Sequence, residues 1–190
     1  MRPFTPPYLG NARRWAGLKV GLFGGSFNPP HAGHLHVCHT ALKRLDLDFI
    51  WWMVTPQNPL KSRGAGANYQ ERMDWSRAIV RHPKILVTDI EAQLGTHVSI
   101  DTVRELKRRF PKTGFMWLTG TDNALILHKW DDWRGLQEEI GFCFVARPPA
   151  LDLIKRAPVR LLSASLTMKN KWILATKTVD ESSTRLRAAQ

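Results

Sequence analysis

Six apolar stretches of strand length alternate with segments of helical periodicity along this chain of 190 residues. Each stretch is apolar throughout rather than at alternate positions, which is typical of a strand buried on both faces of a sheet. The stretches are residues 18–23, 49–54, 85–87, 115–118, 142–145 and 172–175. This alternation predicts an α/β fold with a doubly wound parallel sheet.

Helix signals fill the gaps between these strands. Residues 35–45 and 100–110 repeat apolar side chains every three or four positions and predict amphipathic helices. Asn68 with Glu71 three residues later resembles a capping box, and Ser99 is expected to cap the helix that follows it. Ligands of such sheets bind beyond the carboxyl ends of the strands, so the loops after the first, second and fourth strands are candidate binding sites.

A single compact domain is expected over residues 18–190, because a chain of this length buries enough surface without a disulfide framework. Cys38 and Cys143 lie in apolar surroundings far apart in sequence, and are interpreted as free thiols of a cytoplasmic protein. Residues 1–17 are basic, with three prolines and no acid, and lack the apolar centre of a signal peptide. We interpret them as a mobile arm, and no run reaches the roughly 18 apolar residues of a membrane span.

The chain carries 28 Lys and Arg against 16 Asp and Glu, a formal net charge of +12. This excess favours anionic partners, among which nucleic acid and phosphorylated metabolites are alternatives to a role in solubility alone. The basic residues are spread over every segment without interleaved aromatic residues, which disfavours nucleic acid. We therefore expect no stable nucleic-acid partner and no membrane partner. The oligomeric state stays open, with a homodimer among the arrangements.

Residues 20–35, VGLFGGSFNPPHAGHL, predict a strand, a glycine turn and the start of a helix. Gly24 and Gly25 permit the backbone to approach a ligand closely. His31 and His34 fall on the first turn of the helix, where outward-pointing N–H groups and the helix dipole attract anions. The segment therefore predicts a phosphate site.

Other interpretations of this segment were weighed. It lacks the Gly-Lys-Ser/Thr of a Walker loop and the G-x-G-x-x-G of a dinucleotide fingerprint. A metal site is disfavoured because His31 and His34 share a face, His36 points elsewhere and no acidic residue accompanies them. A purely structural role for each histidine is the plain alternative. That alternative weakens because His-x-Gly-His follows a strand and a Gly-Gly turn.

The sequence GGSFNPPHAGH at 24–34 resembles the signature of the nucleotidyltransferase superfamily with the H-x-G-H motif. A second superfamily motif is matched by SSTRLR at 182–187, with Glu181 where isoleucine is usual. PQNPLK at 56–61, VSIDT at 98–102 and LTGTDNALILHKWDDW at 118–133 are similar to segments of bacterial nicotinate-nucleotide adenylyltransferases. The resemblance covers about residues 18–188.

The resemblance implies a Rossmann-like nucleotidyltransferase fold, and transfer of the adenylyl group of ATP to nicotinate mononucleotide. The products would be deamido-NAD and pyrophosphate. The implied catalytic residues are His31, His34, Lys61 and Arg187. The implied ATP-binding residues are Gly24, Gly25, Ser26, Phe27, His31, His34, Gly120, Asp122, Ser182, Ser183, Thr184 and Arg187. The implied nicotinate nucleotide-binding residues are Gly25, Ser26, Phe27, Lys61, Ser99, Thr121 and Trp130.

Within this set, His34 would lie nearest the α-phosphate of ATP, and Trp130 would stack on the pyridine ring. Some of these residues also have plain structural interpretations. Ser183 and Asp122 could simply cap helices, and Lys61 could be a solvated lysine of a glycine-rich loop. The tryptophans of the predicted strands are expected to be core residues, namely Trp51, Trp52 and Trp117.

Mg²⁺ is expected to arrive with ATP, held mainly by phosphate oxygens and water, and no metal site built from protein side chains is expected. The expected partners are ATP and nicotinate mononucleotide. Two alternatives stay open. The acceptor could be another phosphate compound, such as nicotinamide mononucleotide or phosphopantetheine, or the chain could be a basic nucleic-acid-binding domain.

Overall fold

A six-stranded parallel sheet forms the centre of the computed structural model, which describes residues 5–56, 67–146, 157–158 and 170–173. The strand order is β3-β2-β1-β4-β5-β6, and every neighbouring pair is parallel. The strands are β1 Lys19–Gly25, β2 Phe49–Val54, β3 Ile85–Thr88, β4 Gly114–Gly120, β5 Phe142–Val145 and β6 Lys171–Ile173. The predicted doubly wound α/β fold is confirmed. Residues 174–175 of the sixth predicted strand lie outside the described residues.

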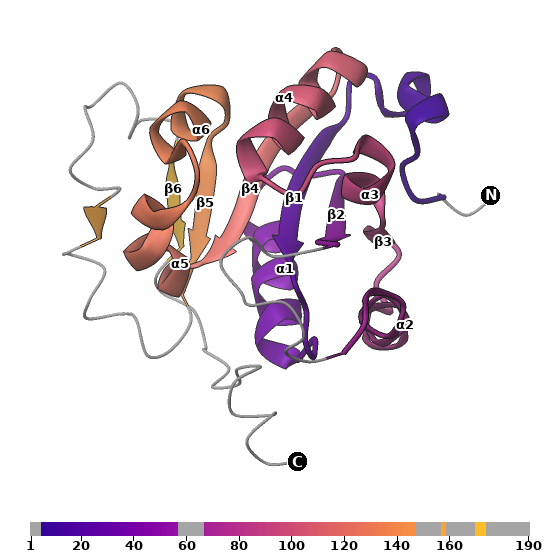
Figure 1. The fold of residues 1–190 in the computed structure, drawn as a ribbon, viewed down its shortest axis with the longest axis horizontal. Coiled ribbons are helices and arrows are strands. Elements are labelled where there is room, and N and C mark those ends of the chain that lie inside the picture. Colours follow the sequence, from indigo (N-terminus) through magenta and orange to yellow (C-terminus); the bar gives the residue numbers. More distant parts are fainter. Residues whose placement is uncertain (1–4, 57–66, 147–156, 159–169, 174–190) are drawn as a thin grey trace.

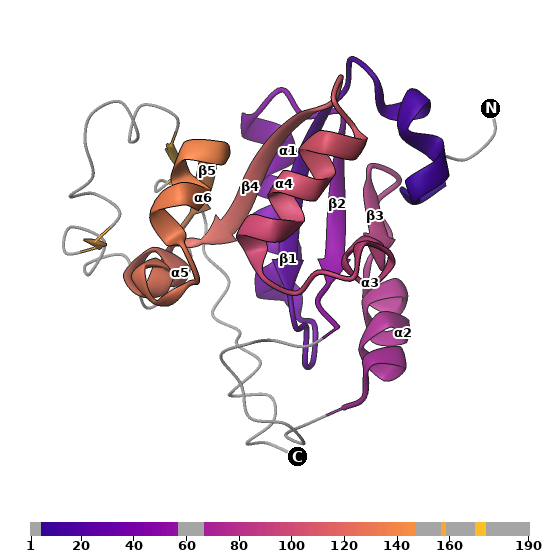
Figure 2. The same ribbon diagram turned by 45° about the horizontal axis from the view of Figure 1, so that its top comes forward.

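Helices cover both faces of this sheet (Figures 1 and 2). They are η1 Leu9–Trp15, α1 Ala32–Arg44, α2 Tyr69–Ile79, α3 Ile90–Leu94, α4 Ser99–Arg109, α5 Thr121–Ile126, η2 Leu127–Lys129 and α6 Trp133–Glu139. Side chains of α1 and α2 pack in one buried cluster, and those of η1, α3, α4 and α6 in another. Leu22 of β1 belongs to the second cluster and the next residue, Phe23, to the first. Successive strand residues point to opposite faces, so two buried faces require the continuous apolar strands seen in the sequence.

Of the two helix caps predicted from the sequence, one is confirmed and one is wrong. The capping box is confirmed, since Glu71 N donates to Asn68 Oδ1 at 3.0 Å and Asn68 N donates to Glu71 Oε2 at 2.8 Å. Ser99 does not cap α4. Val98 holds the extended N-cap position without a side-chain cap, and Ser99 is the first helical residue. Because Ser99 itself lies within the helix, its hydroxyl is not in the N-cap position from which a side chain accepts from the first-turn amides.

The N-terminal segment packs against the sheet over the residues that the structure describes. Trp15 is fully buried, and its ring is edge-on to two other rings. The ring centroids are 4.8 Å apart for Trp51 and 5.5 Å apart for Phe49. Thr88 Oγ1 donates to the carbonyl of Pro7 at 3.3 Å. Burial of this large aromatic side chain attaches the described part of the segment to the sheet.

The buried residues expected from the sequence are found in the core. Cys38 and Cys143 are free and buried. Trp51, Trp52 and Trp117 are at most 2% exposed. Among the described residues, no helix has the length and apolar character needed to cross a bilayer.

Candidate active site

A pocket of about 140 Å³ opens beyond the carboxyl ends of β1 and β2 and beside the end of β4. β1 lies between β2 and β4, so the strand order reverses here, which is where doubly wound sheets bind ligands. Its walls bring together four predicted site residues, Gly24, Gly25, Ser99 and Trp130. These residues come from three separate segments of the chain, which the fold brings together around one pocket.

Gly24 and Gly25, predicted to form a turn, are instead the last two residues of β1 and have no room for side chains. A Cβ added at Gly24 would lie 3.2 Å from the Trp117 ring, and one at Gly25 would lie 3.0 Å from the Phe27 ring. Both distances are tighter than ordinary van der Waals contact. The two glycines therefore leave backbone, rather than side chain, on this wall of the pocket.

His31 and His34 lie together at the start of α1, as predicted. His31 is the N-cap residue, His34 is the third helical residue, and their ring centroids are 3.7 Å apart. His31 N donates to Nδ1 of His34 at 3.2 Å. With Nδ1 acting as an acceptor, neutral His34 carries its proton on Nε2, which can donate to a phosphate oxygen.

The side chain of Phe27 belongs to the core and not to the pocket wall. It is 2% exposed and stacks on Trp52 with ring centroids 4.3 Å apart. Its ring edge also contacts His34 at 5.0 Å. Phe27 has a φ of +46°, an uncommon conformation for a side chain of this size. We infer that this conformation directs the ring beneath His34, where it supports the imidazole.

The predicted residues after β4 lie around the start of α5. Gly120 is the N-cap of α5, so Asp122 does not cap this helix. Asp122 is the second helical residue, on the first turn. Thr121 is fully buried, and Asn123 rather than Asp122 lines the pocket. The other predicted site residues lie outside the described part of the chain, namely Lys61, Ser182, Ser183, Thr184 and Arg187.

Arg72, which the sequence analysis missed, ties the two loops of the site together. Its Nη1 donates to the carbonyls of Ser26 at 2.7 Å and Thr55 at 2.9 Å, and its Nη2 donates to the carbonyl of Pro56 at 3.0 Å. The residue is only 6% exposed, and burial lowers the pKa of its guanidinium. Arg72 lies on the same face of α2 as Ser76, whose burial the structure shows and the sequence does not.

Glu91, also missed, is a buried acid on the pocket wall. It is 2% exposed, and its Oε1 accepts from Oγ1 of Thr102 at 3.2 Å. Among the described residues, Oε2 has no hydrogen-bond partner. Burial raises the pKa of Glu91 from 4.5 to about 7, although the hydrogen bond from Thr102 and the nearby hydroxyl of Thr55 oppose the rise. Glu91 therefore changes charge near neutral pH.

Comparison with known proteins fits this geometry. The cytidylyltransferase-like family model matches residues 22–189. A Ruegeria pomeroyi protein named "Probable nicotinate-nucleotide adenylyltransferase" is 44% identical over 186 residues, which cover 91% of this chain and 87% of that protein. A Cereibacter sphaeroides protein of the same name is 42% identical over 181 residues, covering 90% and 97%.

The chain belongs to the nicotinate-nucleotide adenylyltransferase family. Solved structures agree on the fold of this family. The Plasmodium falciparum nicotinic acid mononucleotide adenylyltransferase complexed with NaAD aligns with a TM-score of 0.67 at 20% identity, covering 90% of this chain and 83% of that one. The same enzyme complexed with APC aligns with a TM-score of 0.65 at 19% identity, with the same coverage. The predicted nucleotidyltransferase fold is confirmed.

Replacing Arg72 by methionine in this member of the adenylyltransferase family is expected to lower the free energy of unfolding by about 2–4 kcal/mol. The reason is that three carbonyl acceptors lose their donors. Urea unfolding measures the change. Arg72→Lys should lie between wild type and Arg72→Met. The matched control Arg77→Met, on an exposed arginine of α2, should change stability by less than about 0.5 kcal/mol. Equal stability of Arg72→Met and wild type would contradict the role of Arg72.

The buried acid of this family member predicts a second stability effect. The folded-state pKa of Glu91 lies above its ordinary value, so the folded state binds the proton more tightly than the unfolded state. The free energy of unfolding of wild type should therefore fall, by up to about 3 kcal/mol, as pH rises from 4.5 to about 7. Glu91→Gln should lack this fall and gain stability relative to wild type above neutral pH. Urea unfolding of both proteins from pH 5 to 8 tests this, and parallel curves would refute it.

Proposed function

We propose that this chain transfers the adenylyl group of ATP to nicotinate mononucleotide, forming deamido-NAD and pyrophosphate in NAD biosynthesis. The observation that carries the proposal is the 44% and 42% identity, over nine-tenths of the chain, to proteins named as nicotinate-nucleotide adenylyltransferases. The pocket at the strand-order reversal supports it, because Gly24 and Gly25 at the end of β1 line it together with Ser99 and Trp130.

The proposed reaction needs no protein nucleophile. An oxygen of the acceptor phosphate attacks the α-phosphorus of ATP, a new P–O bond forms, and the bond to the leaving pyrophosphate breaks. Catalysis then rests on alignment and on stabilising charge at the transferring group. His34 would stabilise this charge by donating from Nε2 to an α-phosphate oxygen. The backbone N–H of His31 would hold the His34 ring through the 3.2 Å hydrogen bond to Nδ1. Ser183, Thr184 and Arg187 are proposed to hold the β- and γ-phosphates, and Lys61 is proposed to add positive charge from the loop after β2.

The acceptor is proposed to occupy the pocket. Trp130 offers a flat ring on the wall, and its edge-on contact with Trp117 at 6.0 Å helps to fix its orientation. Val98, the N-cap residue of α4, makes no side-chain hydrogen bond to the first-turn amides of this helix, which begin at Ser99. Such amides suit a carboxylate, because they add donors to the positive end of a helix dipole.

Mg²⁺ is proposed to enter with ATP and to neutralise charge on the phosphates. Across the described residues, no three His, Cys, Asp or Glu side chains gather as metal ligands would. Oxygen atoms of the phosphates and of water are ligands that suit Mg²⁺. We place the reaction in the cytoplasm, since the free thiols of Cys38 and Cys143 suit a reducing compartment.

Isotope position tests the proposed bond cleavage. With MgATP labelled at the α-phosphate, the label should appear in the dinucleotide. With ATP labelled at the γ-phosphate, the label should appear in pyrophosphate only. Release of labelled inorganic phosphate, or γ-label in the pyridine product, would overturn the proposal.

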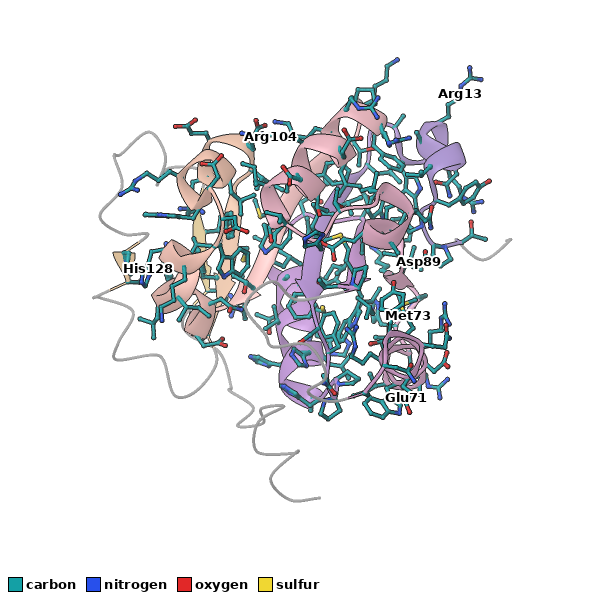
Figure 3. The ribbon with its side chains drawn as sticks, viewed as in Figure 1. Arg13, Glu71, Met73, Asp89, Arg104 and His128 are labelled. Atoms are coloured by element: carbon teal, nitrogen blue, oxygen red, sulfur yellow. The ribbon has the colours of Figure 1, made fainter. Side chains whose placement is uncertain are left out.

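Nucleic-acid binding is a weaker second candidate. Arg13 on η1 and Arg104 on α4 lie at separate edges of the molecule (Figure 3). Arg104 and Lys107 also pair with Glu139, at 3.5 and 2.6 Å. These cations are dispersed or paired, whereas nucleic-acid surfaces concentrate free cations on one face. Steeply salt-dependent retention on DNA without adenylyl transfer would support this candidate.

A further inference from the structure

We propose that Glu91 sets the choice between acid and amide pyridine nucleotides at the acceptor pocket, donating to the acid when protonated and accepting from the amide when ionised. The inference rests on the proposed function and concerns the same pocket. It assigns a specificity-determining role to a residue that lies outside the predicted binding set.

Glu91 lies where such a choice could be made. It lines the pocket from α3, together with Thr55 after β2 and Ser99 at the start of α4. Oγ1 of Thr102, on the first turn of α4, donates a hydrogen bond to Oε1 of Glu91 at 3.2 Å. This contact fixes the carboxyl group beside the helix end whose amides suit a carboxylate, and it leaves Oε2 without a partner among the described residues.

The chemistry of the two acceptors differs at one substituent. A carboxylate accepts hydrogen bonds, so it gains from a protonated glutamic acid and is repelled by an ionised one. A carboxamide also donates through its N–H groups, so an ionised glutamate suits it better. A buried polar group that must stay unpaired with one substrate discriminates strongly against that substrate.

Glu91 is the buried group in its surroundings whose charge changes near neutral pH, since burial raises its pKa to about 7. The ionisable side chains around it come from neighbouring elements of the fold. They are Tyr69 and Arg72 on α2, Asp89 before α3, and His97 and Asp131 on the pocket wall. Burial raises the pKa of Tyr69 to about 12, so it stays neutral, and Arg72 is bound to three carbonyls. His97 is an exposed imidazole on the same pocket wall, so a variant of His97 serves as the control for Glu91.

The test is the ratio of kcat/KM for nicotinate mononucleotide to that for nicotinamide mononucleotide, measured with MgATP from pH 5.5 to 9. Titration of the shared phosphate and of ATP cancels in this ratio. For wild type, the ratio should fall about tenfold or more as pH rises through neutrality. Glu91→Gln, which cannot ionise, should give a ratio that is flat with pH. The matched control His97→Gln should keep the wild-type fall.

Thr102→Val keeps the test falsifiable if Glu91→Gln does not fold. It removes a hydrogen bond that lowers the pKa of Glu91, so the midpoint of the fall should move to higher pH. Three outcomes overturn the role of Glu91 while adenylyl transfer stands. The ratio could be flat with pH in wild type, its fall could persist in Glu91→Gln, or its fall could disappear in His97→Gln. Absence of transfer to either acceptor overturns the proposed function, and this inference with it.

Discussion

Replacing His34 by alanine should lower kcat for adenylyl transfer by about 10²- to 10³-fold, with the fold retained. The substitution removes the Nε2 donor proposed to contact the α-phosphate, and that contact strengthens as charge develops in the transition state. A steady-state assay of pyrophosphate release measures kcat, and circular dichroism confirms the fold.

The matched control for this variant is His39→Ala. His39 lies on the same helix but is exposed, and its ring neighbour is His82 at 5.6 Å rather than a group of the pocket. It should keep wild-type turnover. Unchanged turnover in His34→Ala, or equal losses in both variants, would remove the proposed role of His34.

Replacing Trp130 by alanine should lower kcat/KM for the pyridine acceptor by about ten- to a hundredfold, with little change in KM for ATP. The ring lines the pocket and is proposed to stack on the pyridine, and its loss removes stacking together with buried apolar contact. Varying each substrate in turn separates the two effects.

Trp75→Ala is the matched control for Trp130. Trp75 lies on α2, is 42% exposed and does not line the pocket. It should leave both kinetic constants near wild type. If Trp130→Ala raised KM for ATP as much as KM for the acceptor, Trp130 would be a structural residue of the pocket rather than a platform for the pyridine ring.

The strand pattern was predictable because a parallel sheet with two buried faces leaves no polar positions to obscure it. Leu22 and Phe23 show this, since they are adjacent in sequence and lie in different buried clusters. The start of α2 was predictable because Asn68 and Glu71 satisfy each other's backbone through contacts three residues apart.

The residues that were missed depend on contacts between distant segments. Arg72 binds carbonyls 16, 17 and 46 residues away, and Glu91 receives a hydrogen bond from a residue 11 positions on. Each resembles an ordinary surface charge when only its neighbours in sequence are considered. The burial of Trp15 was missed for the same reason, because its partner Trp51 lies in β2.

The histidine and glycine positions of the site were predictable because their function is local. Gly24 and Gly25 end a strand, and His31 and His34 begin the next helix, so one short segment places all four. That Ser99 and Trp130 belong to one site was predicted only from the resemblance. Their meeting depends on how α4 and the segment after α5 pack at the end of the sheet.

The most direct measurement is pyrophosphate release from MgATP at pH 7, with nicotinate mononucleotide, nicotinamide mononucleotide and phosphopantetheine compared side by side. We expect clear preference for nicotinate mononucleotide and stoichiometric formation of its dinucleotide. Preference for phosphopantetheine, or no release with any acceptor from folded protein, would contradict the proposed function.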